Sequence, residues 1–384
     1  MEAYLDNSAT TRCLDAAVEK MTEALTVNFG NPSSLHMKGV DAEEYLKEAR
    51  HNIAKSLGVS DKEIYFTSGG SESNNTAIIG TAEVRKRYGN KIITTSVEHA
   101  SVKNPMRYLT EHGYEVVYLN VDENGIIDLE QLRNEVDENT ILVSIMHVNN
   151  EIGAIEPIEE VSKIIKEKNP ECLFHVDAIQ SYGKIKIRPK ELGIDFLSVS
   201  GHKINGPKGS GFLFVKDGDR LAPRIYGGGQ EKGLRSGTEN VPAIAGLGVA
   251  AKYADEHLEE HREKFYSLKE RFINAISGIE DIHINGKTGR DSAPQIISVS
   301  VYGVRAEVLL HALEDKGIYV SSGSACSSNH PSQSSTLQSI HVKREALDST
   351  VRFSLGIFNT EEQIDYAAKT LSELVPQLRR FTRK

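Results

Sequence analysis

The sequence has few cysteines, and those it has are far apart. Only three occur in 384 residues, Cys13, Cys172 and Cys326, with no metal-ligand spacing between them. This pattern excludes a disulfide framework and indicates no zinc or other metal site. Cys172 lies in the apolar run CLFHV and is typical of a core residue, whereas Cys326 lies among serines and glycines. Of the three, Cys326 therefore has the exposed setting that a reactive thiol needs.

Long apolar runs and clusters of basic residues are also missing. No run approaches the roughly 20 apolar residues that span a bilayer, and the start, MEAYLDNSATTR, is acidic where a signal peptide is basic and then apolar. The formal net charge of -9 comes without a track of lysines and arginines for a phosphate backbone. We therefore expect a cytoplasmic protein that acts directly on neither membranes nor nucleic acids.

The composition that remains is that of an ordinary folded protein. Hydrophobic residues make up 39% and charged residues 26% of the chain, which is close to the average for globular proteins. A chain of 384 residues is too long for one small core. We predict a large domain over residues 16–255 and a smaller α+β domain made of residues 1–15 and 256–384.

Short apolar runs alternate with amphipathic stretches between about residues 60 and 215. The runs are EIYFT, KIITT, EVVYL, ILVSIM, CLFHV and DFLSV. Such alternation predicts a parallel sheet covered by helices. DFLSV is followed by GFLFV after a connection too short for a crossover helix, so this pair is expected to be antiparallel. The fold class is therefore α/β, with a mixed, mostly parallel sheet of about seven strands.

A long, highly charged helix is expected between about residues 250 and 280, leading out of the sheet domain. Strands in QIISVSVY and GIYVSS and helices in AEVLLHALEDKG and EEQIDYAAKTLSELVPQLRRF would then form the second domain. This mixture gives the smaller domain its α+β character.

Polar residues collect directly after the apolar runs, where doubly wound sheets bind their ligands. EIYFT leads into the glycine-rich turn SGGSESNN and then a helix, a typical anion site. The other runs lead to Ser96, Glu98 and His99, to His147, Asn149 and Asn150, to Asp177 and Gln180, and to Ser200, His202 and Lys203. An anion cradle, a lysine and a carboxylate at one sheet edge are what pyridoxal phosphate requires.

Each of these residues alone has an ordinary structural interpretation. A lysine in a glycine-rich loop is usually solvated, an aspartate after a strand is often a helix cap, and Gly-Ser clusters mark ordinary loops. His99 alone would more often be a hydrogen-bonded structural histidine. Their coincidence at five strand ends favours the cofactor site. Composition does not distinguish pyridoxal phosphate from another phosphorylated ligand, and it does not identify the substrate.

Motifs along nearly the whole chain carry a family resemblance. They include YLDNSATTR, TSGGSESNN, HVDAIQSYGKI, SGHKINGPKGSG and SSGSACSS. On these motifs the sequence resembles the class V aminotransferase group of fold-type I pyridoxal-phosphate enzymes, and specifically the cysteine desulfurases. The resemblance implies conversion of L-cysteine to L-alanine, with the sulfur held as a persulfide and then passed to a protein acceptor.

The resemblance also implies roles around the cofactor ring. Lys203 would hold pyridoxal 5'-phosphate covalently, and His99 would stack on the ring and transfer protons. Asp177 would pair with the ring nitrogen, and Gln180 would bond the phenolic oxygen. Lys203 and His99, together with Cys326, would be the catalytic residues.

The remaining implied roles concern the phosphate, the substrate and the sulfur. The phosphate contacts fall on Gly70, Ser71, Ser200 and His202. Thr238 would reach the phosphate of the neighbouring subunit, which implies a homodimer. Arg352 would bind the substrate carboxylate with Asn150, which would also contact the cofactor. Cys326 would accept the sulfur, and its SSGSACSS setting resembles the group with a long mobile cysteine loop, which favours cysteine over selenocysteine.

Three other interpretations stay open at this point. One is a selenocysteine or cystine lyase on the same scaffold, and another is an aminotransferase proper, which would have no use for Cys326. The third is a cofactor-binding regulator or scaffold, because fold does not fix function. The candidate site has its complete set of lysine, aspartate, histidine, arginine and cysteine, which argues against this third interpretation. The sulfur could go to iron–sulfur assembly, to transfer-RNA thiolation or to a cofactor pathway.

Overall fold

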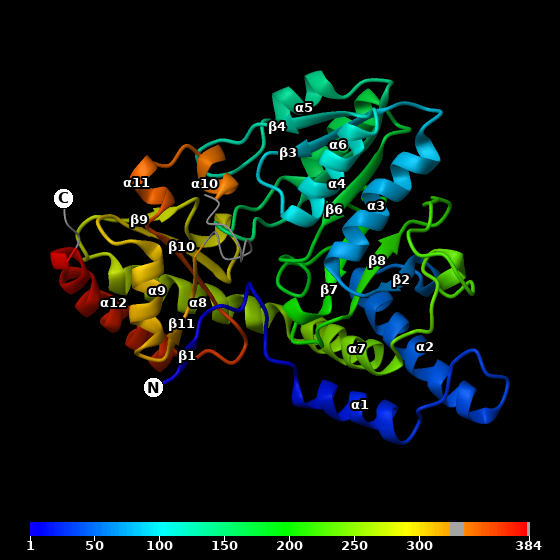
Figure 1. Cartoon of the computed structure of the whole chain (residues 1–384), viewed down its shortest axis with the longest axis horizontal. Helices are drawn as coiled ribbons and strands as arrows, with labels where there is room; N and C mark the ends of the chain where they lie inside the picture. Colours follow the sequence, from blue (N-terminus) through cyan, green and yellow to red (C-terminus); the bar gives the residue numbers. More distant parts are fainter. Residues whose placement is uncertain (323–333, 382–384) are drawn as a thin grey trace.

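The computed structural model describes residues 1–322 and 334–381, and its larger part is built around a seven-stranded sheet (Figure 1). The strands are β2 (Ile64–Thr67), β3 (Lys91–Thr95), β4 (Glu115–Leu119), β5 (Thr140–Met146), β6 (Leu173–Asp177), β7 (Phe196–Ser200) and β8 (Gly211–Val215). They lie in the order β2-β8-β7-β6-β5-β3-β4, and β8 is antiparallel to both of its neighbours. The predicted mixed, mostly parallel α/β sheet is confirmed, including the antiparallel pairing of β7 with β8.

Helices cover both faces of this sheet, so its central strands are buried throughout. They are α1 (Asp15–Thr26), α2 (Met37–Leu57), α3 (Gly70–Arg85), α4 (Ala100–Glu111), α5 (Leu129–Glu135), α6 (Ile158–Lys168) and α7 (Val241–Glu256). Every residue of β5 is buried, as a parallel strand between two helical layers requires. In α6, buried Ile158, Val161 and Ile165 recur at helical spacing and turn one apolar face to the sheet.

A second core lies beside the first and contains an antiparallel sheet of order β12-β13-β10-β9. Its strands are β9 (Ile282–Asn285), β10 (Ile296–Val301), β12 (Ser321–Ser322) and β13 (Thr350–Ser354). Its helices are α8 (Leu258–Ile276), α9 (Ala306–Glu314), α11 (Arg344–Leu347) and α12 (Glu361–Phe381). The division of the chain after residues 15 and 255 stays a prediction.

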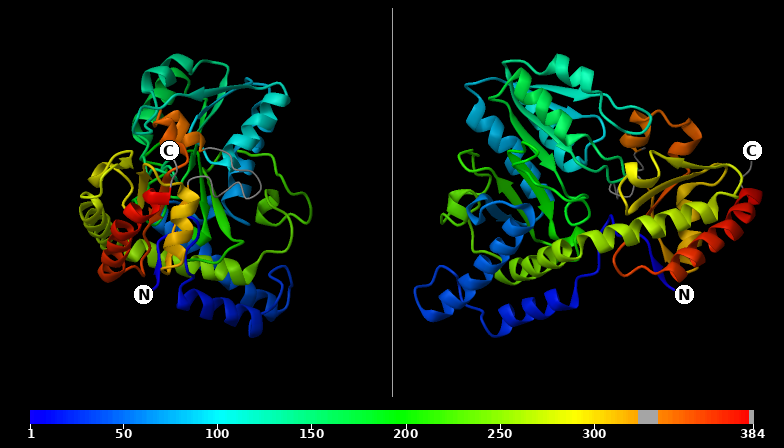
Figure 2. Two further views of the ribbon diagram at one scale, coloured as in Figure 1. Left: turned by 60° about the vertical axis from the view of Figure 1, so that its left-hand side comes forward. Right: turned by 180° about the vertical axis from the view of Figure 1, so that it is seen from behind.

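The chain passes between the two cores along α7 and α8, which follow one another (Figure 2, right). The prediction of one uninterrupted helix here was wrong. His257 separates the two helices with φ −110° and ψ 15°, outside the helical range. Glu259 and Glu260 in the first turn of α8 favour a new helix start there, because acidic side chains stabilise the positive end of a helix.

Residues 3–14 connect the two cores a second time. β1 (Ala3–Tyr4) pairs in parallel with β11 (Ile318–Tyr319) beside the second core. Farther along, the Thr11 amide donates to the His202 carbonyl oxygen of the first core at 2.9 Å. The short helix α10 (Ser335–Ser339) also crosses over, because its Leu337 is buried in the first core. Among the described helices, none has the length and apolarity needed to cross a membrane.

Candidate active site

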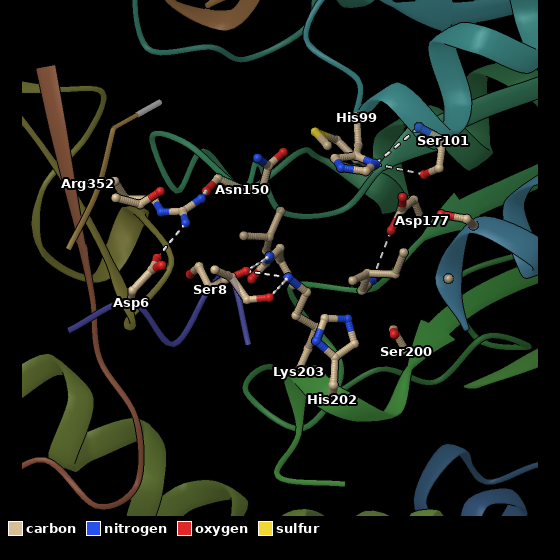
Figure 3. Close-up of a pocket in the computed structure, with 18 of the residues that line it drawn as sticks. Asp6, Ser8, His99, Ser101, Asn150, Asp177, Ser200, His202, Lys203 and Arg352 are labelled. Carbon is tan, nitrogen blue, oxygen red and sulfur yellow. Dashed lines mark hydrogen bonds and ion pairs between the residues drawn. The ribbon is translucent and has the colours of Figure 1, made fainter. Parts of the chain in front are cut away.

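A cavity of about 460 Å³ lies between the two cores, beyond the carboxyl ends of β5, β6 and β7 (Figure 3). Most of the residues predicted from the sequence line it, namely Gly70, Ser71, His99, Asn150, Asp177, Gln180, Ser200, His202, Lys203 and Arg352. Two do not. Thr238 is exposed beside a separate cavity of about 150 Å³, and Cys326 lies outside the described residues.

Asp177 ends β6 as a buried carboxylate held by neutral donors. The Ile179 amide donates to its Oδ1 at 2.9 Å, and the Asn74 side chain donates to its Oδ2 at 2.8 Å. Burial raises the pKa of Asp177. The nearby charges of His99 and Lys203 lower that pKa in turn, and a buried carboxylate is costly unless it is paired. This carboxylate is therefore set to receive a cationic group.

His99 caps the first turn of α4 and faces the same cavity (Figure 3). Its Nδ1 accepts from the Ser101 amide at 3.1 Å, so in the neutral ring the proton lies on Nε2. Burial lowers the pKa of His99, although the charge of Asp177 opposes this effect. Asn74 donates to Ser101 Oγ at 2.9 Å and so joins His99 and Asp177 in one network. Sequence reasoning missed Asn74 and Ser101.

Lys203 follows β7 in the 3-10 turn Gly201–Lys203 and reaches residues 8 and 9 across the cavity. Its Nζ donates to the carbonyl oxygens of Ser8 at 2.5 Å and Ala9 at 2.7 Å. Lys184 Nζ in turn donates to the Lys203 carbonyl oxygen at 2.8 Å. Burial, reinforced by the charge of Lys203, lowers the pKa of Lys184 to about 7. The lysine amine is thus held at the cavity wall by backbone carbonyls.

The amino end of α3 forms one end of the cavity. Gly69 has a φ of +148°, which favours glycine, and a Cβ on Gly70 would lie 2.1 Å from Ile179 Cδ1. The two glycines thus let the first helical amides, which have no intrahelical acceptor, approach β6 and β7 closely. Ser200 lines the same end, as does His202, whose pKa burial lowers to about 4. Neutral donors around a helix start suit a phosphate.

Arg352 in β13 faces the cavity from the second core. Its Nη2 pairs with Asp6 Oδ1 at 2.9 Å, and its Nη1 donates to the Asn150 carbonyl oxygen at 2.8 Å. Its buried Nε has no hydrogen-bond partner among the described residues. Asp6 therefore fixes the guanidinium, while the Nε–H group stays available as a donor. Asp6 belongs to the YLDNSATTR motif, but sequence reasoning gave it no role.

These residues fit pyridoxal phosphate. The carboxylate of Asp177 suits a protonated ring nitrogen, and the start of α3 suits the phosphate. The Gln180 side-chain oxygen, Oε1, is buried and has no partner in the described part of the chain, while Nε2 of the same side chain donates to the Ser8 carbonyl oxygen at 3.0 Å. Because an amide can turn over, Gln180 can meet a ring oxygen by donating instead. The Lys203 amine completes the set.

Known proteins share this sequence and this fold. The model of the family "Aminotransferase class-V" matches residues 3–367. A cysteine desulfurase IscS of Clostridium botulinum is 42% identical over 99% of this chain and 96% of its own length. An IscS of Buchnera aphidicola is 45% identical over 99% of this chain and 94% of its own length. The solved structure of a NifS-like protein superposes with a TM-score of 0.93 at 40% identity, covering 98% of this chain and all of that chain.

Proposed function

This chain belongs to the class-V aminotransferase family, and on that premise we propose how its cavity takes sulfur from L-cysteine. The chain is a pyridoxal-phosphate-dependent cysteine desulfurase of fold type I. The proposal rests on one observation, which is that cofactor-binding and substrate-binding candidates face each other across the same cavity. Lys203 and Asp177 lie on one wall, Arg352 lies on the other, and β12, which precedes the Cys326 stretch in the sequence, lines the same cavity.

The first core binds the cofactor in this proposal. Lys203 Nζ would hold pyridoxal 5'-phosphate, Asp177 would keep the ring nitrogen protonated, and Gln180 would donate to the phenolic oxygen. Gly70, Ser71, Ser200 and His202 would bind the phosphate. When bound, the cofactor supplies an electron sink for the pair that remains at Cα after its proton leaves.

The second core orients the substrate. Arg352 binds the carboxylate of L-cysteine with its unpartnered Nε and the adjacent guanidinium edge, and Asp6 restricts the rotation of that group. A planar guanidinium suits a carboxylate better than an ammonium does, because it presents two parallel N–H bonds. The Asn150 side chain lines the cavity beside this carboxylate site.

Two groups move protons. Lys203 Nζ would accept the proton that leaves the substrate Cα. His99 carries its proton on Nε2, because the Ser101 amide occupies Nδ1, and it can give that proton up on the cavity side.

Cys326 then takes the sulfur. Its thiolate attacks the substrate sulfur, so an S–S bond forms and the Cβ–S bond breaks. The electron pair of that bond stays with Cβ, which gains a proton to become a methyl group, and the proton held by Lys203 returns to Cα, which completes alanine. Both sulfurs remain as a persulfide on Cys326 until a protein acceptor takes the terminal one. The selenocysteine or cystine lyase alternative is not favoured, because the relatives are named cysteine desulfurases.

The same proposal includes where the enzyme acts, its oligomeric state and its sulfur acceptor. The protein acts in the cytoplasm as a homodimer and delivers sulfur to a protein acceptor, as in iron–sulfur assembly. Support for the dimer comes from apolar side chains exposed to solvent on one stretch of the chain, namely Leu25, Val27, Phe29, Leu35, Met37 and Val40. Exposed apolar patches of this kind mark protein interfaces.

Cys326→Ser tests the proposal directly. The variant should bind the cofactor and L-cysteine, because Lys203, Asp177 and Arg352 are intact, yet release no alanine. Intact-mass analysis of wild type after L-cysteine should show one added sulfur on the Cys326 peptide, removed by dithiothreitol. Cys13→Ser and Cys172→Ser serve as matched controls and should turn over normally. Alanine release by Cys326→Ser at the wild-type rate would overturn the assignment.

A further inference from the structure

Four side chains fasten the start of α10 to the first core. Ser334 Oγ donates to Glu151 Oε2, and Lys103 Nζ donates to Ser335 Oγ at 2.5 Å. Glu151 lies in the loop after β5, and Lys103 lies in α4. We call Glu151, Lys103, Ser334 and Ser335 the α10 clasp.

The α10 clasp holds a helix whose apolar side chains also pack in the first core. Leu337 and Ile340 at α10 are 1% and 4% exposed and pack in the same core as the sheet. Ser334 Oγ also accepts from the Leu337 amide at 3.0 Å, which caps the helix. One hydroxyl therefore couples the helix start to the Glu151 carboxylate.

Glu151 is itself held in place by its backbone. Its amide donates to Asn149 Oδ1 at 2.9 Å, and the fully buried Asn149 side chain donates to the Val97 carbonyl oxygen at 3.1 Å. Val97 lies in the turn just before His99. The clasp is thus anchored on the same loops that carry the cofactor site.

The preceding strand is fastened as well, but to the second core. In β12, Ser321 pairs with Arg352 of β13, and both Ser321 and Ser322 line the cavity. In the sequence, residues 323–333 with Cys326 connect this strand to the α10 clasp. The two attachment points of the Cys326 stretch are therefore a strand beside the proposed carboxylate site and a helix start bonded to Glu151.

We propose that Glu151 is a positioning residue for sulfur transfer, which sets the far attachment point of the stretch that carries Cys326. It acts through Ser334 and does not touch the substrate. The proposal rests on the proposed function, in which Cys326 accepts the sulfur. Loss of the carboxylate should leave cofactor and L-cysteine binding intact and should slow the attack of Cys326 on the substrate sulfur.

The test compares Glu151→Ala, Glu151→Gln and the matched control Glu160→Ala, an exposed glutamate of α6, all in the cofactor-loaded enzyme. Removing the acceptor of a charge-assisted bond should slow single-turnover persulfide formation on Cys326 on the order of 10-fold in Glu151→Ala. Glu151→Gln keeps an oxygen acceptor and should recover part of the rate. The dissociation constant of L-cysteine, read from the absorbance of the bound cofactor, should stay at the wild-type value.

Hydrogen exchange gives a second readout that needs no turnover. Backbone amides of residues 335–340 should exchange faster in Glu151→Ala than in wild type or Glu160→Ala. Unchanged exchange, or faster exchange with a wild-type rate of persulfide formation, would overturn the positioning role, and so would weakened L-cysteine binding that accounts for the slower rate. If wild type itself forms no persulfide, the proposed function fails, and the exchange comparison still decides whether Glu151 holds α10.

Discussion

Asp177 carries the electronic part of the proposed reaction, because its charge decides whether the cofactor ring stays protonated. Two neutral donors hold the carboxylate, and the nearby charges of His99 and Lys203 favour its ionised form. A pyridinium N–H would then be its charged partner. Such a bond is stronger in this buried setting than it would be at the surface.

Asp177→Asn should keep the fold and lose turnover, because the amide cannot stabilise a protonated ring nitrogen. A charge-assisted bond contributes about 1.5–3 kcal/mol, so kcat should fall by at least about 10- to 150-fold, with the lost electron sink adding to this. The rate of alanine release measures the effect. Asp128→Asn is the control, since Asp128 is an exposed helix cap whose role asparagine can take over. Near-normal turnover of Asp177→Asn would contradict the assigned role.

At the same scale, the sequence predicted the residues with distinctive chemistry and missed their supports. Lys203, Asp177 and His99 follow strands and belong to recognisable motifs. Asn74 and Asp6 gave no comparable signal, since an asparagine in a helix and an aspartate near the amino end have many ordinary uses. Asp6 meets Arg352 across 346 positions of sequence, and such a contact follows from the tertiary fold rather than from any local pattern.

The sequence predicted helices and strands correctly where a local feature, such as the length of a connection, determines them. The antiparallel pairing of β7 with β8 follows from a connection too short for a crossover. The break between α7 and α8 was missed because the sequence has no glycine or proline there, and the change of direction depends on one set of torsion angles at His257. β13 was missed as well, although it carries Arg352 between two residues of the second core.

α8 offers a test of stability at the scale of one helix. Lys269 is buried in it and donates to Ser292 Oγ at 2.7 Å and to the Ala293 carbonyl oxygen at 2.8 Å. Burial lowers the pKa of Lys269 from 10.5 to about 7. Between these two values the unfolded chain binds a proton that the folded chain does not. The free energy of unfolding should therefore rise with pH across this window, by at most about 1.4 kcal/mol per pH unit.

Lys269→Met should remove this contribution. We expect urea unfolding midpoints at pH 7, 8 and 9 to rise less steeply in Lys269→Met than in wild type. Lys252→Met, at an exposed position of α7, should keep the wild-type slope. Equal slopes in all three proteins would show that Lys269 stays charged in the folded state.

At the scale of the whole molecule, the proposed dimer predicts shared active sites. Thr238 lies apart from the main cavity in its own chain, so it would act on the phosphate of the partner subunit. Mixing Lys203→Ala with Thr238→Ala subunits should yield hybrids with one doubly damaged site and one intact site. Activity should therefore partly recover on mixing, whereas each variant mixed with itself should stay inactive. A monomer by light scattering at micromolar concentration would reject the proposal.

The alternation of apolar runs was enough to predict the α/β class, whereas the division into two domains, expected from the length of the chain, stays a prediction. The crossing of residues 3–14 between the cores was not predicted, because the bridging contacts join residues that are far apart in the sequence, such as Thr11 and His202. The same holds for α10, which lies in the sequence between β12 and β13 of the second core but buries Leu337 in the first. In both cases long-range packing overrides the order of the chain.

The crossing of residues 3–14 also affects the order in which parts of the enzyme can fold during its synthesis. Ser8 accepts a hydrogen bond from Lys203, and Asp6 pairs with Arg352. Both residues leave the ribosome long before β11 and β13 have been synthesised. Domains tend to fold as units during synthesis, so the first sheet can form while this early strand still waits for its partners. On the proposed function, the substrate carboxylate site at Arg352 is therefore completed last, and a nascent chain stopped before residue 350 should bind the cofactor but not L-cysteine.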